Sequence, residues 1–376
     1  MYNEYIKKYS PFSNDSPAPF DSFIGRKDII EKILKQTPKL KEDKPQNYFI
    51  SSKKGFGKTS LVLYIEELLY NKMHTIYISN KGNDSLEDLC VDIIETFLNI
   101  FPQKISEKIK ANLFGQKIEI NDLARFTEDI VKYFPSYLEY ICKYLPKNVL
   151  LICDDMDDLI NNTSFVNWYI NLINEINLNN YKIPIYFILT SLKLNFDAAD
   201  ESFKNLFNYY NLGFLEDEDV EEFFELSFDS VDMSLDNGEW DDALSYLISY
   251  SSGIPWLMQE IGENIFQHAH YPEKITQRDI NEGLIDTSET VYYKEIRDIY
   301  IEYFKDPVFD RIFKKILPII SLDGFMRDDF SKYLVGDELI FLDEYLLKAL
   351  NLEILVLDNG VYSFVNRFYS IYFSNI

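Results

Sequence analysis

The sequence predicts an α/β protein in which a parallel β-sheet has helices on both faces and is followed by an all-helical domain and a small C-terminal module. Two observations support this fold class. Over about the first 215 residues, short apolar runs rich in β-branched and aromatic side chains alternate with helical patterns, which is typical of a parallel sheet with two covered faces. Farther along, apolar residues recur at helical spacing up to a hairpin signal near the end.

The first predicted domain spans residues 21–212. Residues 1–20 contain three prolines and no hydrophobic periodicity, so we expect an N-terminal tail there. The stretch at about 100–146 has apolar residues at helical spacing and predicts a helical insertion between the second and third strands. The expected strands are residues 47–52, 74–80, 148–153 and 183–189, with a fifth at 209–215.

The rest of the chain predicts two further domains. Residues 213–304 are expected to form an all-helical lid. Within it, residues 216–242 contain 13 acidic residues and no Lys or Arg. That charge run indicates solvated helix faces or, alternatively, a surface for a basic partner. Residues 305–376 have three helical patterns and then two apolar runs joined by Asn359-Gly360, a strong hairpin signal. This order of elements predicts a winged-helix domain.

Composition and charge exclude some classes of protein. The chain has 376 residues with 29 Phe and 28 Tyr but only 13 Gly and 13 Pro, which indicates packed domains rather than a disordered chain. The 62 acidic residues outnumber the 37 basic ones, and the net charge is −25. Such a charge repels nucleic-acid phosphates at long range.

Cysteine content and apolar runs bear on where the protein works. The three cysteines have no CxxC spacing, so neither a disulfide framework nor a zinc site is predicted. The first twenty residues lack the apolar core of a secretory signal, and no run of about 18 apolar residues could span a bilayer. We therefore expect a cytoplasmic protein with no membrane partner.

The most informative stretch is a glycine-rich turn between an apolar strand and an amphipathic helix, FISSKKGFGKTSLVLYI. This is the context of a P-loop, in which glycines let backbone N–H groups approach phosphate oxygens. Lys58 is expected to reach the β and γ phosphates of ATP, and the Thr59 hydroxyl to ligate Mg²⁺. Ser52 replaces the usual leading glycine. The loop residues expected to bind the nucleotide are Lys54, Gly55, Phe56, Gly57, Lys58, Thr59 and Ser60.

A second motif, NVLLICDDMDDL, places two consecutive carboxylates after an apolar strand. Asp154 is expected to hold Mg²⁺ through water and Asp155 to orient the attacking water, which Mg²⁺-nucleotide chemistry requires at this edge of a sheet. Asp157 and Asp158 are interpreted as helix-cap or surface residues. Thr190 or Ser191, after the fourth strand, is expected either to sense the γ-phosphate or to act only as a local cap. Together the two motifs predict a P-loop nucleotide-binding domain.

Several motifs together resemble P-loop ATPases of the AAA+-related STAND type, and most closely the archaeal-type ATPase family that neighbours the origin-recognition initiators. The motifs are FIGR, GFGKTS, LLICDDMD, Thr190-Ser191, Gly253-Ile254-Pro255 and the predicted winged helix, and the resemblance covers about residues 20–376. In that family the FxGR segment and the GxP turn flank the adenine. The resemblance therefore implies a base pocket lined by Ile24, Gly25, Arg26 and Pro255.

The sequence departs from the family at the attacking-water position. AAA+ enzymes with rapid turnover usually have Glu where this chain has Asp155, which is one methylene shorter and would misplace the water by about 1 Å. Slow hydrolysis is the expected result. No arginine after the GxP turn is clearly the sensor-two residue, and only spacing makes Arg278 and Arg297 candidates. No arginine finger is assigned.

These observations predict a regulatory ATPase that acts as a nucleotide-dependent conformational switch. A protein partner is expected, and the resemblance implies a homo-oligomer in the ATP state. One alternative is an initiator-like DNA-binding ATPase, which the charge opposes: residues 306–376 contain 7 basic and 11 acidic side chains, whereas DNA-binding domains are basic. A second alternative is a scaffold that retains nucleotide without hydrolysing it.

Overall fold

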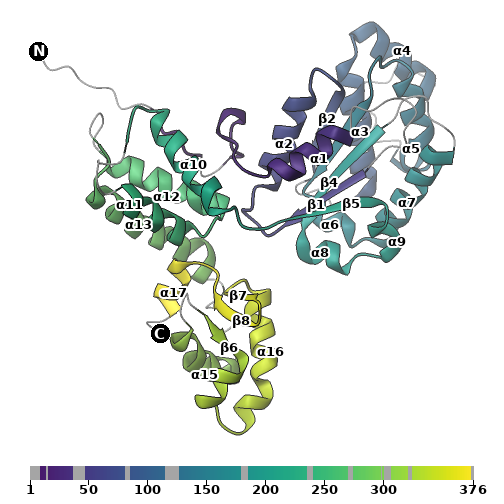
Figure 1. Ribbon diagram of the computed structural model, residues 1–376. Coiled ribbons are helices and arrows are strands. Elements are labelled where there is room, and N and C mark those ends of the chain that lie inside the picture. The colour runs from purple at the N-terminus through teal and green to yellow at the C-terminus, as the bar shows by residue number, and fades with distance from the viewer. Residues whose placement is uncertain are drawn as a thin grey trace, which may run out of the picture. The chain divides into compact units, whose positions relative to one another are not determined.

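The computed structural model describes most of the chain and divides it into two compact units (Figure 1). We call Pro17–Gly213 the sheet unit, and Met1–Ser16 together with Phe214–Ile376 the helical unit. The predicted boundary between lid and winged helix, near residue 304, stays a prediction. The described residues are 9–13, 16–36, 47–80, 85–114, 127–178, 185–234, 240–269, 274–297, 299, 306–320 and 324–373.

The sheet unit is built on the predicted five-stranded sheet, in which every pair of neighbouring strands is parallel. The spatial order is β2-β3-β4-β1-β5, so β4 lies between β1 and β3. The sequence placed the fifth strand two residues late, because the pairing of Asn47 with Phe207 extends its start. The strands are β1 (Asn47–Ser52), β2 (His74–Ser79), β3 (Val149–Asp154), β4 (Ile185–Leu192) and β5 (Phe207–Leu212).

Helices cover both faces of this sheet, as predicted (Figure 1). Ile50, Ile152 and Ile188 share one face with α1 (Lys27–Gln36) and α2 (Lys58–Leu69). Their chain neighbours point to the opposite face, because side chains alternate along a strand. That face carries α3 (Leu86–Ile100), α4 (Gln103–Phe114), α5 (Thr127–Cys142), α6 (Asp157–Ile160), α7 (Thr163–Leu178), α8 (Lys193–Ala198) and α9 (Glu201–Lys204).

Part of the N-terminal segment that was expected to be a tail is packed: residues 10–13 contact the helices that follow the sheet unit, whereas residues 1–8 lie outside the described residues. Phe12 is buried against Phe223 and Phe228 of the helical unit. The Ser13 N–H donates to Gln259 Oε1 at 2.7 Å, and the Ser10 hydroxyl donates to Glu263. The burial of the Phe12 ring and these hydrogen bonds offset part of the entropy cost of ordering the segment.

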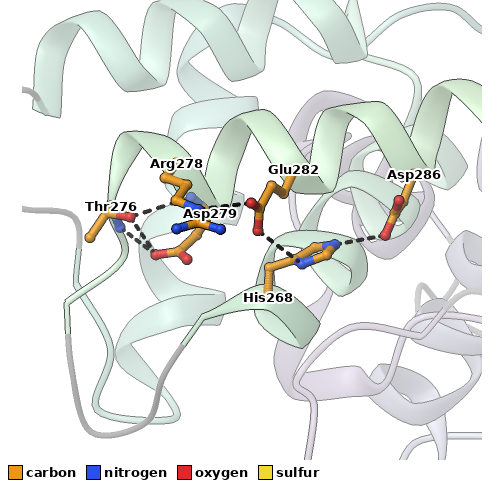
Figure 2. A network of polar contacts seen from close by, with 6 residues as sticks. All are labelled: His268, Thr276, Arg278, Asp279, Glu282 and Asp286. Carbon is orange, nitrogen blue, oxygen red and sulfur yellow. Dashed lines mark hydrogen bonds and ion pairs between the residues drawn. The ribbon is translucent and has the colours of Figure 1, made fainter.

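Four helices make up the first part of the helical unit: α10 (Asp217–Asp229), α11 (Trp240–Ser251), α12 (Pro255–His268) and α13 (Gln277–Val291), which runs on as η3 (Tyr292–Ile296). Figure 2 shows the polar contacts between the end of α12 and α13. His268 Nε2 lies 2.7 Å from Asp286 Oδ2, and its Nδ1 lies 3.4 Å from Glu282 Oε2. Thr276 and Asp279 form a reciprocal capping box that begins α13. These contacts fix the two helices to each other.

The C-terminal part of the helical unit contains the predicted hairpin. Asn359 and Gly360 have φ values of 48° and 85°, as a type I′ turn requires. The second of the three expected helices, at residues 326–334, is instead a 3₁₀ helix that follows a short strand, and Met326 of that strand pairs with Val361. The elements are α15 (Pro307–Ile316), η4 (Leu317–Ile319), β6 (Phe325–Met326), η5 (Arg327–Lys332), α16 (Asp337–Asn351), β7 (Leu355–Asp358), β8 (Val361–Phe364) and α17 (Arg367–Phe373), with sheet order β6-β8-β7.

The structure also describes the state of the three cysteines and the apolar character of the helices. All three cysteines are free and buried, and burial raises the pKa of both Cys142 and Cys153 to about 12, so these thiols stay protonated and unreactive. Within the described ranges, no helix combines the length and the apolar character needed to cross a membrane.

Candidate nucleotide-binding site

The predicted P-loop connects β1 to α2. Gly55 and Gly57 have φ values of 81° and 85°, a left-handed conformation that suits glycine. Gly57 is the N-cap of α2, and Lys58 is the first helical residue. The loop therefore curves around a helix N-terminus, where backbone N–H groups and the helix dipole favour an anion. Phosphate is the anion that this arrangement commonly binds.

Lys58 is held inside the curve of the loop. Its side chain is buried, and its Nζ donates to Ser52 Oγ and to the Lys53 carbonyl, each at 3.4 Å. Ser52 Oγ in turn donates to the Lys53 carbonyl at 2.7 Å. Ser52 is the last residue of β1 and has no positive φ, so its backbone does not require glycine. The serine fits at this position and orients the lysine.

The ends of three neighbouring strands meet at one edge of the sheet. Ile50 on β1 pairs with Thr190 on β4, and Leu189 pairs with Cys153 on β3. Because side chains alternate, Ser52, Thr190 and Asp154 all lie on the face that α2 covers. The structure therefore brings the P-loop and the paired aspartates, 96 residues apart from Lys58 to Asp154 in sequence, to the same corner of the sheet unit.

Asp154 is completely buried, and both of its carboxylate oxygens accept hydrogen bonds. The Thr190 hydroxyl donates to Oδ1. The Tyr77 hydroxyl on β2 donates to Oδ2 at 2.9 Å. Burial and the charge of Asp154 both raise the pKa of Tyr77, so this phenol remains a donor. Tyr77 could not be identified from a motif, because its only signal in the sequence is its place near the end of the neighbouring strand.

Asp155 follows with a left-handed backbone, at φ 57°. Aspartate tolerates this conformation better than most residues that have a side chain. The Asp155 N–H donates to Thr190 Oγ1 at 3.1 Å, so one threonine hydroxyl contacts both aspartates. The side chain of Asp155 is half-buried. This geometry fixes the backbone of the residue predicted to orient water.

Asp157 does more than the cap or surface role expected from the sequence. Its Oδ1 accepts from the Ser191 hydroxyl at 2.7 Å and from the Leu192 N–H at 2.6 Å. It therefore ties the start of α6 to the end of β4. Asp158, its neighbour, is exposed as expected.

The FIGR segment is fixed to the outside of α2. The ring of Tyr64 on α2 stacks on Phe20 of η1 (Phe20–Ser22) at 4.6 Å and on Phe23 at 4.4 Å between centroids. The next turn is sharp, because Gly25 and Arg26 both have positive φ, 79° and 60°. The Arg26 guanidinium donates to the carbonyl of Gly213. Ile24, Gly25 and Arg26 thus belong to the same compact unit as the P-loop.

The remaining predicted binding residues differ in exposure. Lys54 is exposed, Phe56 is buried, and Thr59 and Ser60 are half-buried. Ser60 Oγ accepts the Ala18 N–H at 3.1 Å, a contact that the sequence did not suggest. Pro255 is the first residue of α12, in the helical unit, and its place in a base pocket stays a prediction.

The chemistry of the site fits magnesium better than a transition metal. The Thr59 hydroxyl and the Asp154 carboxylate are hard oxygen donors, the kind that Mg²⁺ prefers. Among the described residues, no group of three or more His, Cys, Asp or Glu side chains is placed to hold a metal ion. Mg²⁺ commonly uses one or two protein ligands together with phosphate and water.

Comparisons with known proteins agree with this geometry. The fold is similar to that of a Walker-type ATPase of Pyrococcus abyssi, with 13% identity, 97% of this chain and 100% of that chain covered, and a TM-score of 0.62. It is also similar to Cdc6p from Pyrobaculum aerophilum, with 14% identity, coverage of 96% and 95%, and a TM-score of 0.50. At these identities the likeness shows the fold alone, which is that of P-loop ATPases.

A search of curated proteins finds no match to this chain. The sequence does match a family described as an ATPase domain predominantly from Archaea, over residues 23–261. That range is more than half of the chain and contains the P-loop, the paired aspartates and Thr190. The chain therefore belongs to this family of ATPase domains.

Proposed function

We propose that the protein is a slowly hydrolysing, Mg²⁺-dependent ATPase that works as a conformational switch. One observation carries the proposal. Lys58 at the start of α2 and the Asp154–Thr190–Asp155 arrangement lie at the carboxyl ends of neighbouring strands of one sheet. Ligands of open α/β sheets bind at this edge.

Each predicted residue then has a role in binding or chemistry. The loop from Lys54 to Ser60 would hold the phosphates through backbone N–H groups, and Lys58 would meet the β and γ phosphates. Thr59 and Asp154 would hold Mg²⁺, which neutralises charge on the phosphate oxygens when bound. Asp155 would orient the attacking water. We assign slow turnover to the short Asp155 side chain.

The hydrogen bonds of Thr190 favour a local role over the alternative of sensing the γ-phosphate. A hydroxyl has one proton to donate, and Thr190 donates it to Asp154. The Ser191 hydroxyl is likewise within 2.7 Å of Asp157 Oδ1. We therefore propose that Thr190 positions the two aspartates rather than sensing the γ-phosphate.

Other parts of the proposal rest on the sequence resemblance alone. They are the STAND subtype, a base pocket that combines Ile24, Gly25 and Arg26 with Pro255, relay of the nucleotide state to a C-terminal winged helix, and assembly into a homo-oligomer with ATP. Assembly into a homo-oligomer is tested by measuring the molar mass by size-exclusion chromatography with light scattering, once in ATP and once in ADP. The same mass in both would contradict it.

We propose a protein partner, rather than DNA, for the C-terminal module. A helix that reads DNA presents polar and basic side chains. The exposed surface of α16 instead presents apolar and acidic side chains, with Ile340 73% exposed and Leu347 58% exposed two turns apart. Asp343 beside them is paired with Arg327, the two atoms Oδ1 and Nε being 2.6 Å apart. An apolar and acidic helix suits protein contact better than phosphate contact.

The main experiment measures phosphate release from Mg-ATP by nucleotide-free wild-type protein and by Lys58→Ala. We expect turnover below about 1 s⁻¹ that Lys58→Ala abolishes. Lys72→Ala, an exposed lysine just beyond the far end of α2, is the matched control and should be as active as wild type. Equal release by wild type and Lys58→Ala would indicate a contaminating enzyme.

Two other outcomes would favour the alternatives. Lys58-dependent nucleotide binding without any turnover would favour the non-hydrolysing scaffold. Duplex DNA binding in a gel-shift assay at micromolar protein, weakening as salt rises, would favour the initiator-like ATPase. We expect no such shift.

A further inference from the structure

Tyr77 reaches Asp154 across two neighbouring strands. On β2 and β3, Tyr77 pairs with Ile152, and Ser79 pairs with Asp154. Ile152 and Asp154 are two residues apart, so both point to the face of the sheet that α2 covers. A long aromatic side chain can span the diagonal between neighbouring strands. The Tyr77 hydroxyl therefore ends 2.9 Å from Asp154 Oδ2.

The two hydroxyls together restrict the Asp154 carboxylate. Thr190 on β4 binds one oxygen, and Tyr77 on β2 binds the other. These strands lie on opposite sides of β3, so rotation of the carboxylate breaks both bonds. Each carboxylate oxygen has about two lone-pair sites. One site on each oxygen consequently remains for a further partner, such as water on a metal ion.

We propose that Tyr77 is a positioning residue that sets the Mg²⁺ affinity of the nucleotide site by fixing Asp154. This inference rests on the proposed function. Hydrogen bonds to the groups that hold a metal typically change its affinity by about 10- to 100-fold when they are removed. Thr190 also contacts Asp155, whereas the Tyr77 hydroxyl hydrogen-bonds to Asp154 and to Ser79 on its own strand. Removing the Tyr77 hydroxyl should therefore change metal binding and leave the P-loop unaltered.

The test is equilibrium binding of a fluorescent ATP analogue to nucleotide-free, full-length protein, first in EDTA and then over a Mg²⁺ titration. For Tyr77→Phe we expect the half-saturating Mg²⁺ concentration to rise about tenfold, with the Kd in EDTA unchanged. Tyr169→Phe is the matched control, because the Tyr169 hydroxyl is buried and has no hydrogen-bond partner among the described residues. It should leave both values as in wild type.

Several results would overturn the proposal. The first is an unchanged or lower Mg²⁺ requirement in Tyr77→Phe. The second is nucleotide binding that Tyr77→Phe weakens equally in EDTA and in Mg²⁺, because that result indicates a purely structural role. If wild-type protein binds no nucleotide in either condition, the proposed function fails as well, and the two failures are thereby told apart.

A double-mutant cycle gives a second test. If Tyr77 acts through Asp154, adding Tyr77→Phe to Asp154→Asn should not change the Mg²⁺ requirement further. A second, independent rise in that requirement would show that Tyr77 acts by another route. Thermal unfolding of each variant without nucleotide verifies that all four proteins in the cycle are folded.

Discussion

The ring of Phe12 lies directly against the backbone of Gly262. A Cβ added to this glycine would come within 2.2 Å of Phe12 Cε1. Gly262 lies in the middle of α12, where glycine is normally unfavourable by about 1 kcal/mol relative to alanine. The bare backbone thus makes room for a side chain 250 residues away in sequence.

This contact predicts that the effect of Gly262→Ala on the free energy of unfolding changes sign when the Phe12 ring is removed. Gly262→Ala alone should lower the free energy of unfolding, because the Phe12 ring must move. In a Phe12→Ala background the same change should raise it by up to about 1 kcal/mol, the helix-propensity gain. Phe12→Ala alone should cost about 3–5 kcal/mol. Urea denaturation of the four proteins measures the coupling, and purely additive effects would mean that the ring does not rest on Gly262.

Lengthening the side chain of Asp155 should accelerate hydrolysis. If Asp155 orients the attacking water, as proposed above, Asp155→Glu brings the carboxylate closer to that water, and we expect turnover to rise about 10- to 100-fold. The free energy of unfolding should fall by about 1 kcal/mol, because glutamate fits a left-handed backbone less well than aspartate. Asp155→Asn, which keeps the backbone preference, should lose turnover. An Asp155→Glu variant no faster than wild type would remove side-chain length as the cause of slow hydrolysis.

Asp157 should contribute to stability although Asp158 does not. Asp157→Ala leaves the Ser191 hydroxyl and the Leu192 N–H without this acceptor, and we expect a cost of about 1–3 kcal/mol. Asp158→Ala changes an exposed side chain on the same short helix and should cost about 0.5 kcal/mol or less. Urea denaturation measures the free energy of unfolding of the two variants. Equal losses of stability would mean that Asp157 acts through the helix dipole and not through its contact with β4.

Glu66 on α2 should destabilise the protein at neutral pH. Burial raises its pKa, an effect that a hydrogen bond from Thr75 only partly offsets. A carboxyl group with a raised folded-state pKa stabilises the fold below its ordinary pKa of 4.5, and that contribution is lost as pH rises through the folded value. Glu66→Gln should therefore raise the Tm at pH 8.

The pH dependence distinguishes this effect from a simple change in packing. The Tm difference between Glu66→Gln and wild type should shrink as the pH is lowered from about 8 towards 5. Glu67→Gln, at an exposed position on the same helix, should give a smaller and flatter difference. A gain for Glu66→Gln that does not vary with pH would contradict the ionisation argument.

The P-loop and the paired aspartates could be predicted because each is a continuous stretch in which local pattern and chemistry agree. Glycines between a strand and a helix, or two carboxylates after a buried strand, have few other interpretations. The five strands were predictable for the same reason: their apolar runs are short and are separated by helical patterns. The sheet then brings the two motifs together through its parallel order.

Tyr77 and Phe12 could not be predicted, because their roles depend on contacts that the local sequence does not encode. Tyr77 is one of 28 tyrosines, and only the β2–β3 register places it beside Asp154. Phe12 lies in a segment with the composition of a tail, and its burial depends on helices more than 200 residues later. Asp157 was misread because its partners belong to β4, a separate strand.

The packing of the first residues also sets the order of folding. The Ser13 N–H and its acceptor on Gln259 are 246 residues apart, so a ribosome releases the whole sheet unit before the partner helices of Ser13 exist. Closing a flexible loop of that length costs on the order of 5 kcal/mol. A sheet unit that has already folded shortens the effective loop and lowers this cost. We therefore expect the segment around Ser13 to pack after the sheet unit has folded, although it is synthesised before that unit.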